Sequence, residues 1–296
     1  MVHRGGLLLS GFSLSGTAPR TLFAADEGRR PRLKFGVVTD IHYADKEPTS
    51  TRFYRESLEK LSADLDLLEP HRPDFIVELG DLIDKSDDID QQIEFLKRIE
   101  EVYAKATCDR HYVLGNHCVE TLTKSEFIEN CGATAAHYSF DKGGVHFVVL
   151  DACFRGDGVS YGRNNHDWKD TKIPAEQMEW LRQDLERSGK PTIVFAHQRL
   201  DGEGAHWVEN AAAVRGILAE SGQVLAVLQG HSHKNDYRRL DGIHFCTMVA
   251  VVEGSGAENN GGALVSLFDD GSIRIEGFFR QSSYDFGGNS PASLSK

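Results

Sequence analysis

Five short polar motifs each follow a hydrophobic, strand-like run of this 296-residue chain. They are, in order, Asp40-Ile41-His42, Gly80-Asp81-Leu82-Ile83-Asp84, Gly115-Asn116-His117, a lone His197, and Gly230-His231-Ser232-His233. In α/β folds, ligands bind where strands end at their carboxyl edge, so five such ends are expected to converge on one site. The motifs offer Asp, Asn and His side chains and no thiolate, a ligand set that suits a pair of divalent cations. Such a pair is the device of two-metal phosphoester hydrolysis.

The spacing of the motifs predicts which side chains share an ion. Asp81 is the natural bridge between two ions about 3.5 to 4 Å apart, because it ends a central strand behind a glycine that allows close approach to the backbone. Asp40 and His42 alternate along a segment that we expect to be extended, so both side chains can reach one ion. The same alternation is expected of His231 and His233.

Taken singly, each motif has an ordinary structural explanation. His197 alone is more often a satisfied core histidine, and Asp84 alone could cap the following helix. The other histidines are interpreted in the same ordinary way, except His166, which lies in a long loop. Chance is nevertheless a poor explanation for five motifs in order behind five strands, so the joint pattern predicts a metal site.

Apolar periodicity predicts alternating helices and strands from Leu33 onward, the pattern of an α/β layered fold. Helices are predicted over 54–68, 89–99, 174–185 and 208–218. Strands are predicted for the motif-bearing runs 35–39, 75–79, 111–114, 192–196 and 224–229, and again over 145–150, 243–248, 263–268 and 273–277. Asp269-Asp270-Gly271 predicts a hairpin between the last two.

The late run of strands, with few helices between them, indicates a second, largely antiparallel sheet packed face to face with the first, with helices outside. Residues 151–172 are rich in Gly, Asn, Arg and His and lack apolar periodicity. A loop of that length is usually functional or disordered. Without an internal repeat or a long linker, residues 31–296 are expected to form a single domain.

The motif set resembles the calcineurin-like metallophosphoesterase family, whose pattern is Asp-x-His, Gly-Asp-x-x-Asp, Gly-Asn-His, His and Gly-His-x-His. The resemblance covers residues 33 to about 280 and fills every metal-ligand position. It implies a four-layer sandwich of two mixed β-sheets flanked by helices, and two divalent metal ions (Mn, Fe or Zn). By the resemblance, one ion would be held by Asp40, His42, Asp81 and His233, and the other by Asp81, Asn116, His197 and His231.

The same resemblance implies the roles of two further residues. A metal-bound hydroxide would attack phosphorus in line, and His117 would stabilise the transition state or protonate the leaving oxygen. Asp84 occupies the position of the carboxylate that keeps this histidine protonated. Cys118 is a departure, because many relatives carry an acidic residue directly after Gly-Asn-His.

Residues 35–40, 43–45 and 52–58 resemble the manganese-dependent ADP-ribose/CDP-alcohol diphosphatase branch, which cleaves a phosphoanhydride in nucleoside-diphosphate compounds. The expected substrate is therefore a small phosphoester or an anhydride of that type. The candidate phosphate ligands are Arg52, Arg155, Arg163 and Arg199. A guanidinium group binds phosphate bidentately, although the usual exposure of arginine favours a solvated surface role for each.

Two alternatives stay open. One is a general phosphomonoesterase or phosphodiesterase, and the other is a non-catalytic, metal-dependent binding protein. The second is disfavoured because His117 and all seven ligand positions are retained. A protein Ser/Thr phosphatase is disfavoured because Lys85-Ser86 stand where that branch carries Arg-Gly.

Charge and composition narrow the class of partner. The net charge of −12 argues against general affinity for a nucleic-acid backbone, so the expected partner is a small phosphorylated molecule. No apolar stretch approaches the roughly 18 to 20 residues of a membrane helix. The five cysteines form no CxxC pair, and Cys153 and Cys246 are expected to be small buried hydrophobic residues. One disulfide remains possible, and the sequence does not indicate which cysteines would form it.

The first 30 residues differ from the rest of the chain. Arg4 precedes Gly5-Gly6-Leu7-Leu8-Leu9, and a stretch rich in Ser, Gly and Ala follows as far as Ala25. This pattern is typical of an export signal with a small-residue cleavage region, so we expect a periplasmic or secreted protein. The alternative is a disordered tail on a cytoplasmic protein.

Overall fold

The structure is a computed structural model that describes residues 29–287. From Pro31 onward the described residues belong to one compact unit. The segment expected to resemble an export signal lies almost wholly outside the described residues. No helix within the described range is long and apolar enough to cross a membrane.

The first sheet contains six strands in the order β12-β11-β10-β1-β2-β3. Strands β1 (Leu33–Val38), β2 (Phe75–Glu78) and β3 (Asp109–Tyr112) run parallel to one another. Strands β10 (Gly261–Leu267), β11 (Ile273–Phe279) and β12 (Tyr284–Phe286) add to the other edge of β1 in antiparallel pairs. The predicted hairpin between β10 and β11 is confirmed.

The second sheet has the order β4-β5-β6-β7-β9-β8. Its strands are β4 (Tyr138–Lys142), β5 (Val145–Val149), β6 (Thr192–Ala196), β7 (Val224–Gln229), β8 (Asp236–Leu240) and β9 (Ile243–Thr247). The inner pairs are parallel and the two edge strands, β4 and β8, are antiparallel. Both sheets are therefore mixed, as predicted from the family resemblance.

The expectation that the late strands build a second, largely antiparallel sheet is wrong. Strands β10 to β12 return to the first sheet, because β2 occupies one edge of β1 and leaves the other edge to be paired. The second sheet is built instead from the middle of the chain. Sequence analysis missed three strands, β4, β8 and β12, and all three lie at sheet edges.

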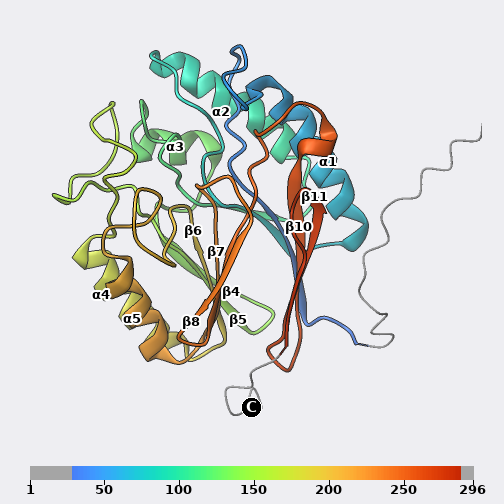
Figure 1. Cartoon of the computed structure of the whole chain (residues 1–296), viewed down its shortest axis with the longest axis vertical. Coiled ribbons are helices and arrows are strands. Elements are labelled where there is room, and N and C mark those ends of the chain that lie inside the picture. The colour runs from blue at the N-terminus through green and yellow to red at the C-terminus, as the bar shows by residue number, and fades with distance from the viewer. Residues whose placement is uncertain (1–28, 288–296) are drawn as a thin grey trace, which may run out of the picture. The chain divides into compact units, whose positions relative to one another are not determined.

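Helices cover the outer face of each sheet (Figure 1). Helices α1 (Ser57–Leu68), α2 (Ile89–Tyr103) and α3 (Lys124–Cys131) accompany the first sheet, and α4 (Ala175–Ser188) and α5 (Ala211–Ser221) accompany the second. Short 3-10 helices span Tyr54–Glu56, Glu69–His71 and Ala257–Asn259. Sequence analysis missed α3, although Thr123 and Glu126 form a capping box at its start.

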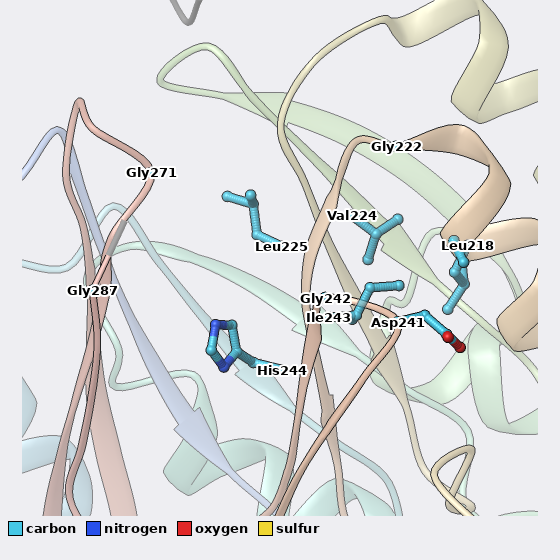
Figure 2. Close-up of a pocket in the computed structure, with 11 residues that line it drawn as sticks. Leu218, Gly222, Val224, Leu225, Asp241, Gly242, Ile243, His244, Gly271 and Gly287 are labelled. Atoms are coloured by element: carbon cyan, nitrogen blue, oxygen red, sulfur yellow. The ribbon is translucent and has the colours of Figure 1, made fainter. Parts of the chain in front are cut away.

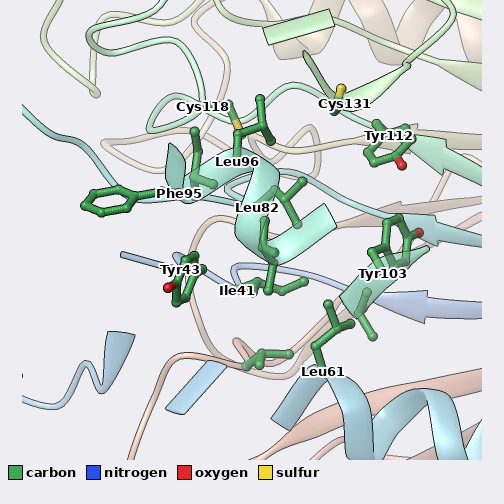
Figure 3. Packing of buried hydrophobic residues seen from close by; sticks show 14 of the residues in the cluster. Ile41, Tyr43, Leu61, Leu82, Phe95, Leu96, Tyr103, Tyr112, Cys118 and Cys131 are labelled. Atoms are coloured by element: carbon green, nitrogen blue, oxygen red, sulfur yellow. The ribbon is translucent and has the colours of Figure 1, made fainter. Parts of the chain in front are cut away.

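Three apolar layers hold these four layers of secondary structure together. Between the two sheets, Phe35 stacks on Phe75 with ring centroids 4.8 Å apart, and Phe147 meets Phe75 edge-on at 4.9 Å. Between the first sheet and its helices, Ile41, Leu61 and Leu96 belong to a second buried cluster (Figure 3). A third cluster lies between the second sheet and α4 and α5.

The cysteines belong to these apolar layers. Cys153 and Cys246 are fully buried, as expected of small hydrophobic residues. All five cysteines are free thiols, so the disulfide that the sequence left possible is not formed.

We expect Leu96→Ala to lower the free energy of unfolding by about 2 to 5 kcal/mol, because Leu96 is fully buried and its truncation leaves a cavity. Leu67→Ala is the matched control, since Leu67 is 40% exposed on α1 and should change stability by less than about 0.5 kcal/mol. Urea unfolding of both variants measures the difference. Equal losses would contradict the packing described for this layer.

Candidate metal centre

The five motifs lie together because they follow five parallel strands at the same end of the two sheets. The segments behind β1, β2 and β3 come from the first sheet, and those behind β6 and β7 from the second. Backbone hydrogen bonds join the segments to one another: His42 N–H donates to Asp81 O at 2.7 Å, and Gly230 N–H donates to His197 O at 3.1 Å. The predicted convergence of the motifs therefore occurs.

One carboxylate lies between two groups of imidazoles. Asp81 Oδ2 is 3.5 Å from His42 Nε2 and 3.1 Å from His197 Nε2. On the His42 side, His233 Nε2 is 3.1 Å from His42 Nε2. On the His197 side, His231 Nδ1 is 3.2 Å from His197 Nε2. The geometry thus divides the histidines into two pairs that share Asp81.

The remaining oxygen donors complete each group. Asp40 Oδ1 is 3.3 Å from His233 Nε2, and its other oxygen accepts hydrogen bonds from Thr39 Oγ1 at 2.8 Å and His231 N–H at 3.0 Å. Asp40 Oδ1 and Asn116 Oδ1 are buried and accept no hydrogen bond. A buried oxygen without a donor is costly, and a cation removes that cost. These residues fit two divalent cations in donor type and arrangement.

Five of the candidate metal-ligand residues have a left-handed backbone conformation. The φ angles are 51° at Asp40, 46° at His42, 60° at Asp81, 70° at His231 and 59° at His233. The expectation that the Asp40/His42 and His231/His233 pairs lie on extended segments is therefore wrong. The strands have ended, and the chain turns sharply so that residues two apart point to one place. Each such conformation is unfavourable for a residue with a Cβ and clusters at functional sites.

Glycines in two motifs allow the segments to approach. A Cβ on Gly115 would lie 2.2 Å from Asp81 N, and a Cβ on Gly80 would lie 2.5 Å from His197 Nδ1. Gly80 also has φ of 106°. The space beside Gly80 is thus used by the His197 ring, whose Nδ1 lies 3.0 Å from Leu79 O. These contacts fix the ring plane and direct Nε2 of His197 toward Asp81.

Electrostatics at the centre favour added positive charge. Burial alone would raise the pKa of Asp81, but His197, His117 and His42 lower it well below the usual range, so the carboxylate is ionised. Burial lowers the pKa of His42 to about 4, which leaves a neutral imidazole able to act as a ligand. Burial also lowers the pKa of His233, but Asp40 and Glu253 raise it to about 9. The carboxylates thus draw cationic charge, which divalent ions supply.

His117 and Asp84 form a further pair beside the centre, and a nitrogen of His117 lies within 4.8 Å of candidate ligand atoms of His42 and Asp81. His117 Nδ1 is 2.7 Å from Asp84 Oδ1, and Asp84 Oδ2 is 2.9 Å from Lys46 Nζ. Burial lowers the pKa of His117, but the carboxylates of Asp81 and Asp84 outweigh it, and the net pKa lies above the ordinary value. The pair can therefore hold a proton on the imidazole.

A model of calcineurin-like phosphoesterases matches residues 33–235, more than two thirds of the chain. The chain belongs to the calcineurin-like phosphoesterase family. This membership confirms the resemblance drawn from the motifs and the expected class of enzyme, a phosphoesterase.

Three relatives show how far the similarity extends. The chain is 22% identical over 306 residues to a manganese-dependent ADP-ribose/CDP-alcohol diphosphatase of Arabidopsis thaliana, covering 87% of this chain and 98% of that protein. It is 36% identical over 141 residues to the protein of that name from Xenopus tropicalis, and this match covers 45% of this chain and 36% of that protein. A dimetal phosphatase structure from Danio rerio matches with a TM-score of 0.78 at 20% identity, covering 88% of this chain and 100% of that one. The predicted fold is confirmed.

The metal centre opens into a pocket of about 230 Å³. Its walls are Arg52, Asp81, Asn116, His117, Trp168, His206, His231 and His233. Five of these come from the family motifs and a sixth is a predicted arginine. Trp168 and His206 were not predicted, although Trp168 lies in the 151–172 loop, whose composition had indicated a functional segment.

Glu253 is a further residue that sequence reasoning missed. Its Oε1 lies 2.6 Å from His233 Nδ1, so it fixes the ring that presents Nε2 to the centre. Such a partner both orients a ligand histidine and raises its basicity. Glu253 is 20 positions from His233 and belongs to no motif, and no sequence signal was available to find it. Lys60 holds the Glu253 segment by donating to Val251 O at 3.0 Å and Glu253 O at 3.2 Å.

The four predicted arginines have different surroundings. Arg52 lines the pocket, whereas Arg155 pairs with Asp157 at 2.7 Å and is not among the lining residues. Arg163 pairs with Glu126, again away from the pocket wall. Arg199 is buried and pairs with Asp201 at 2.7 Å. Its guanidinium also lies 3.5 Å from the Oγ of Ser232, the residue between His231 and His233 in the last motif. His166 stacks on Tyr161 at 3.7 Å within the long loop.

A second pocket of about 240 Å³ lies elsewhere (Figure 2). Val224 and Ile243 in its wall begin β7 and β9, whereas the metal centre follows the ends of the strands. Among the described residues that line it, the ionisable side chains are Asp241 and His244, and none belongs to a candidate metal-binding group.

We expect Asp81→Asn to lose bound metal, because an amide offers one neutral oxygen in place of a carboxylate shared by two groups of ligands. Elemental analysis after loading with manganese and desalting should find about two ions per chain in the wild type and fewer than one in the variant. Asp184→Asn is the control, since Asp184 is a buried carboxylate that contacts His146 at 2.8 Å and lies outside the centre. Two tightly held ions in Asp81→Asn would remove the bridging assignment.

Proposed function

We propose that this protein is a binuclear, manganese-dependent hydrolase that cleaves the phosphoanhydride of nucleoside-diphosphate compounds. The observation that carries the proposal is the buried Asp81 carboxylate, which two groups of candidate ligands share. The names of the relatives, manganese-dependent ADP-ribose/CDP-alcohol diphosphatases, support the substrate class and the metal.

Each proposed ligand set draws on both sheets. Asp40, His42, Asp81 and His233 would hold one ion, and Asp81, Asn116, His197 and His231 the other. When bound, two such ions lower the pKa of water and polarise phosphoryl oxygens. The chain's own contribution is to hold the His42 imidazole neutral by burial, to fix the rings of His233 and His197 through Glu253 and Leu79 O, and to keep the Asp81 carboxylate ionised.

We infer that His117 donates the proton that the leaving oxygen of the substrate takes up. Asp84 faces Nδ1 of the ring, so Nε2 is the nitrogen left for a substrate oxygen. The carboxylate pair raises the pKa of His117, so that the ring carries a proton to give. Arg52, on the pocket wall, would bind the second phosphoryl group of a diphosphate.

The proposal predicts a substrate order. With manganese, kcat/KM for ADP-ribose and CDP-choline should exceed that for p-nitrophenyl phosphate and its bis-ester by at least roughly 10-fold, because Arg52 gives a second phosphoryl group a binding partner. A chelator should abolish all four activities. Turnover of the aryl esters alone would identify a general phosphomonoesterase or phosphodiesterase instead.

His117→Ala should retain its metal ions and lose turnover by roughly 10²- to 10⁴-fold, the usual contribution of a general acid. Metal content and kcat are measured on the same preparation. His137→Ala is the control, because His137 is partly buried against Trp180, with ring centroids 4.8 Å apart, and lies outside the pocket wall. An unchanged rate in His117→Ala would exclude it from proton transfer.

A further inference from the structure

The pocket above the metal centre is too small for a whole nucleoside-diphosphate compound. Its volume is about 230 Å³, below the range of about 300 to 1,000 Å³ that encloses most of a small-molecule ligand. The phosphoryl groups and ions would take up this space. The organic part of the substrate must then lie at the mouth of the pocket, where the exposed wall residues decide what binds.

Trp168 supplies an exposed aromatic surface at that mouth. It is 37% exposed, and among the exposed large hydrophobic residues of the described range it is the one that lines the pocket. Its ring centroid is 5.6 Å from that of the candidate ligand His231 and 5.1 Å from that of His206. The Trp168 ring is therefore next to the ring of a candidate metal ligand. It is positioned to meet the base of a nucleotide, which the ribose separates from the reacting phosphorus.

The chain holds Trp168 in place before any ligand arrives. It lies in a turn closed by Asp170 N–H donating to Asp167 O at 2.9 Å. Tyr161 Oη donates to Asp170 O at 2.5 Å, and Gly156 N–H donates to Asp170 Oδ1 at 2.7 Å. These bonds tie the turn to the remainder of the 151–172 loop. A surface ordered in advance costs a ligand less entropy on binding.

His206 adds a polar group next to the indole. It lines the same pocket, and its Nδ1 is buried without a hydrogen-bond partner. The part of the ring that lines the pocket can face a ribose hydroxyl or the edge of a base.

We propose that Trp168 and His206 form a nucleoside subsite, in which the base of the substrate stacks on the Trp168 indole beside the metal centre. The inference rests on the proposed function and names the part of the substrate that this chain recognises outside the phosphoryl groups. Stacking does not distinguish bases, because every base has a π-face. The subsite therefore selects nucleotides over alkyl phosphates and accepts purines and pyrimidines alike.

Equilibrium binding to the manganese-loaded full chain tests the subsite without relying on turnover. Calorimetry compares AMP and CMP with ribose 5-phosphate, which has the sugar and phosphate but no base. In the wild type, both nucleotides should bind roughly 5- to 100-fold more tightly than ribose 5-phosphate, the range of one base–aromatic stack. Trp168→Ala should bind all three equally, with affinity for ribose 5-phosphate unchanged, and Trp168→Phe should keep most of the preference.

Trp180→Ala is the matched control, since Trp180 packs on His137 outside the pocket. It should keep the wild-type preference, and metal content should be equal in all variants. Equal affinity of the wild type for AMP and ribose 5-phosphate, or a preference that survives in Trp168→Ala, would overturn the subsite. A base preference without cleavage of ADP-ribose would overturn the proposed reaction and leave the subsite standing.

Discussion

The burial of ionised carboxylates at the junction of two sheets is the constraint on which this structure depends. Asp40 and Asp81 are almost completely removed from water, where an uncompensated charge is very costly. Both pKa values nevertheless lie well below the usual range, because imidazoles surround them. The centre is therefore stable only with positive charge in it. Backbone hydrogen bonds between the motifs, and the contacts of His197 with Leu79 O and of His233 with Glu253, hold these carboxylates and imidazoles in place.

The two-sheet architecture is what brings these groups together. Parallel strands end at one edge, and packing two such sheets face to face places two of these edges side by side. The stacked Phe35 and Phe75 rings and their neighbours fix the separation of the sheets. Beyond the strand ends, five candidate ligand residues have left-handed conformations, each costing roughly 1 to 3 kcal/mol, and backbone hydrogen bonds join their motifs to one another. A strained centre of this kind needs the rigid packing beneath it.

Sequence analysis found the polar side chains that directly follow strands. It missed the features that depend on contacts between residues far apart in the sequence. The motifs located Asp81 and the histidines because chance is a poor explanation for five polar motifs that follow five apolar runs in the family's order. The backbone turn at His42 stayed hidden, since a two-residue spacing suits an extended segment equally well. The pairing of β10 with β1 also stayed hidden, because strand composition does not encode the neighbour. Glu253 became visible only through its contact with His233.

The deep part of the site determines the reaction class, and the outer part determines which substrates bind. The candidate metal ligands directly follow the strands. Their residue types and spacing suit divalent ions and phosphoryl chemistry, and so they determine the reaction class. They say nothing of the group attached to phosphorus, which lies beyond a pocket of about 230 Å³. That group meets residues from loops, where neither periodicity nor motif spacing constrains the sequence. The contrast between Arg52 on the pocket wall and Arg163 paired with Glu126 shows the consequence. Substrate preference in this chain must be read from which loop side chains remain available to a ligand.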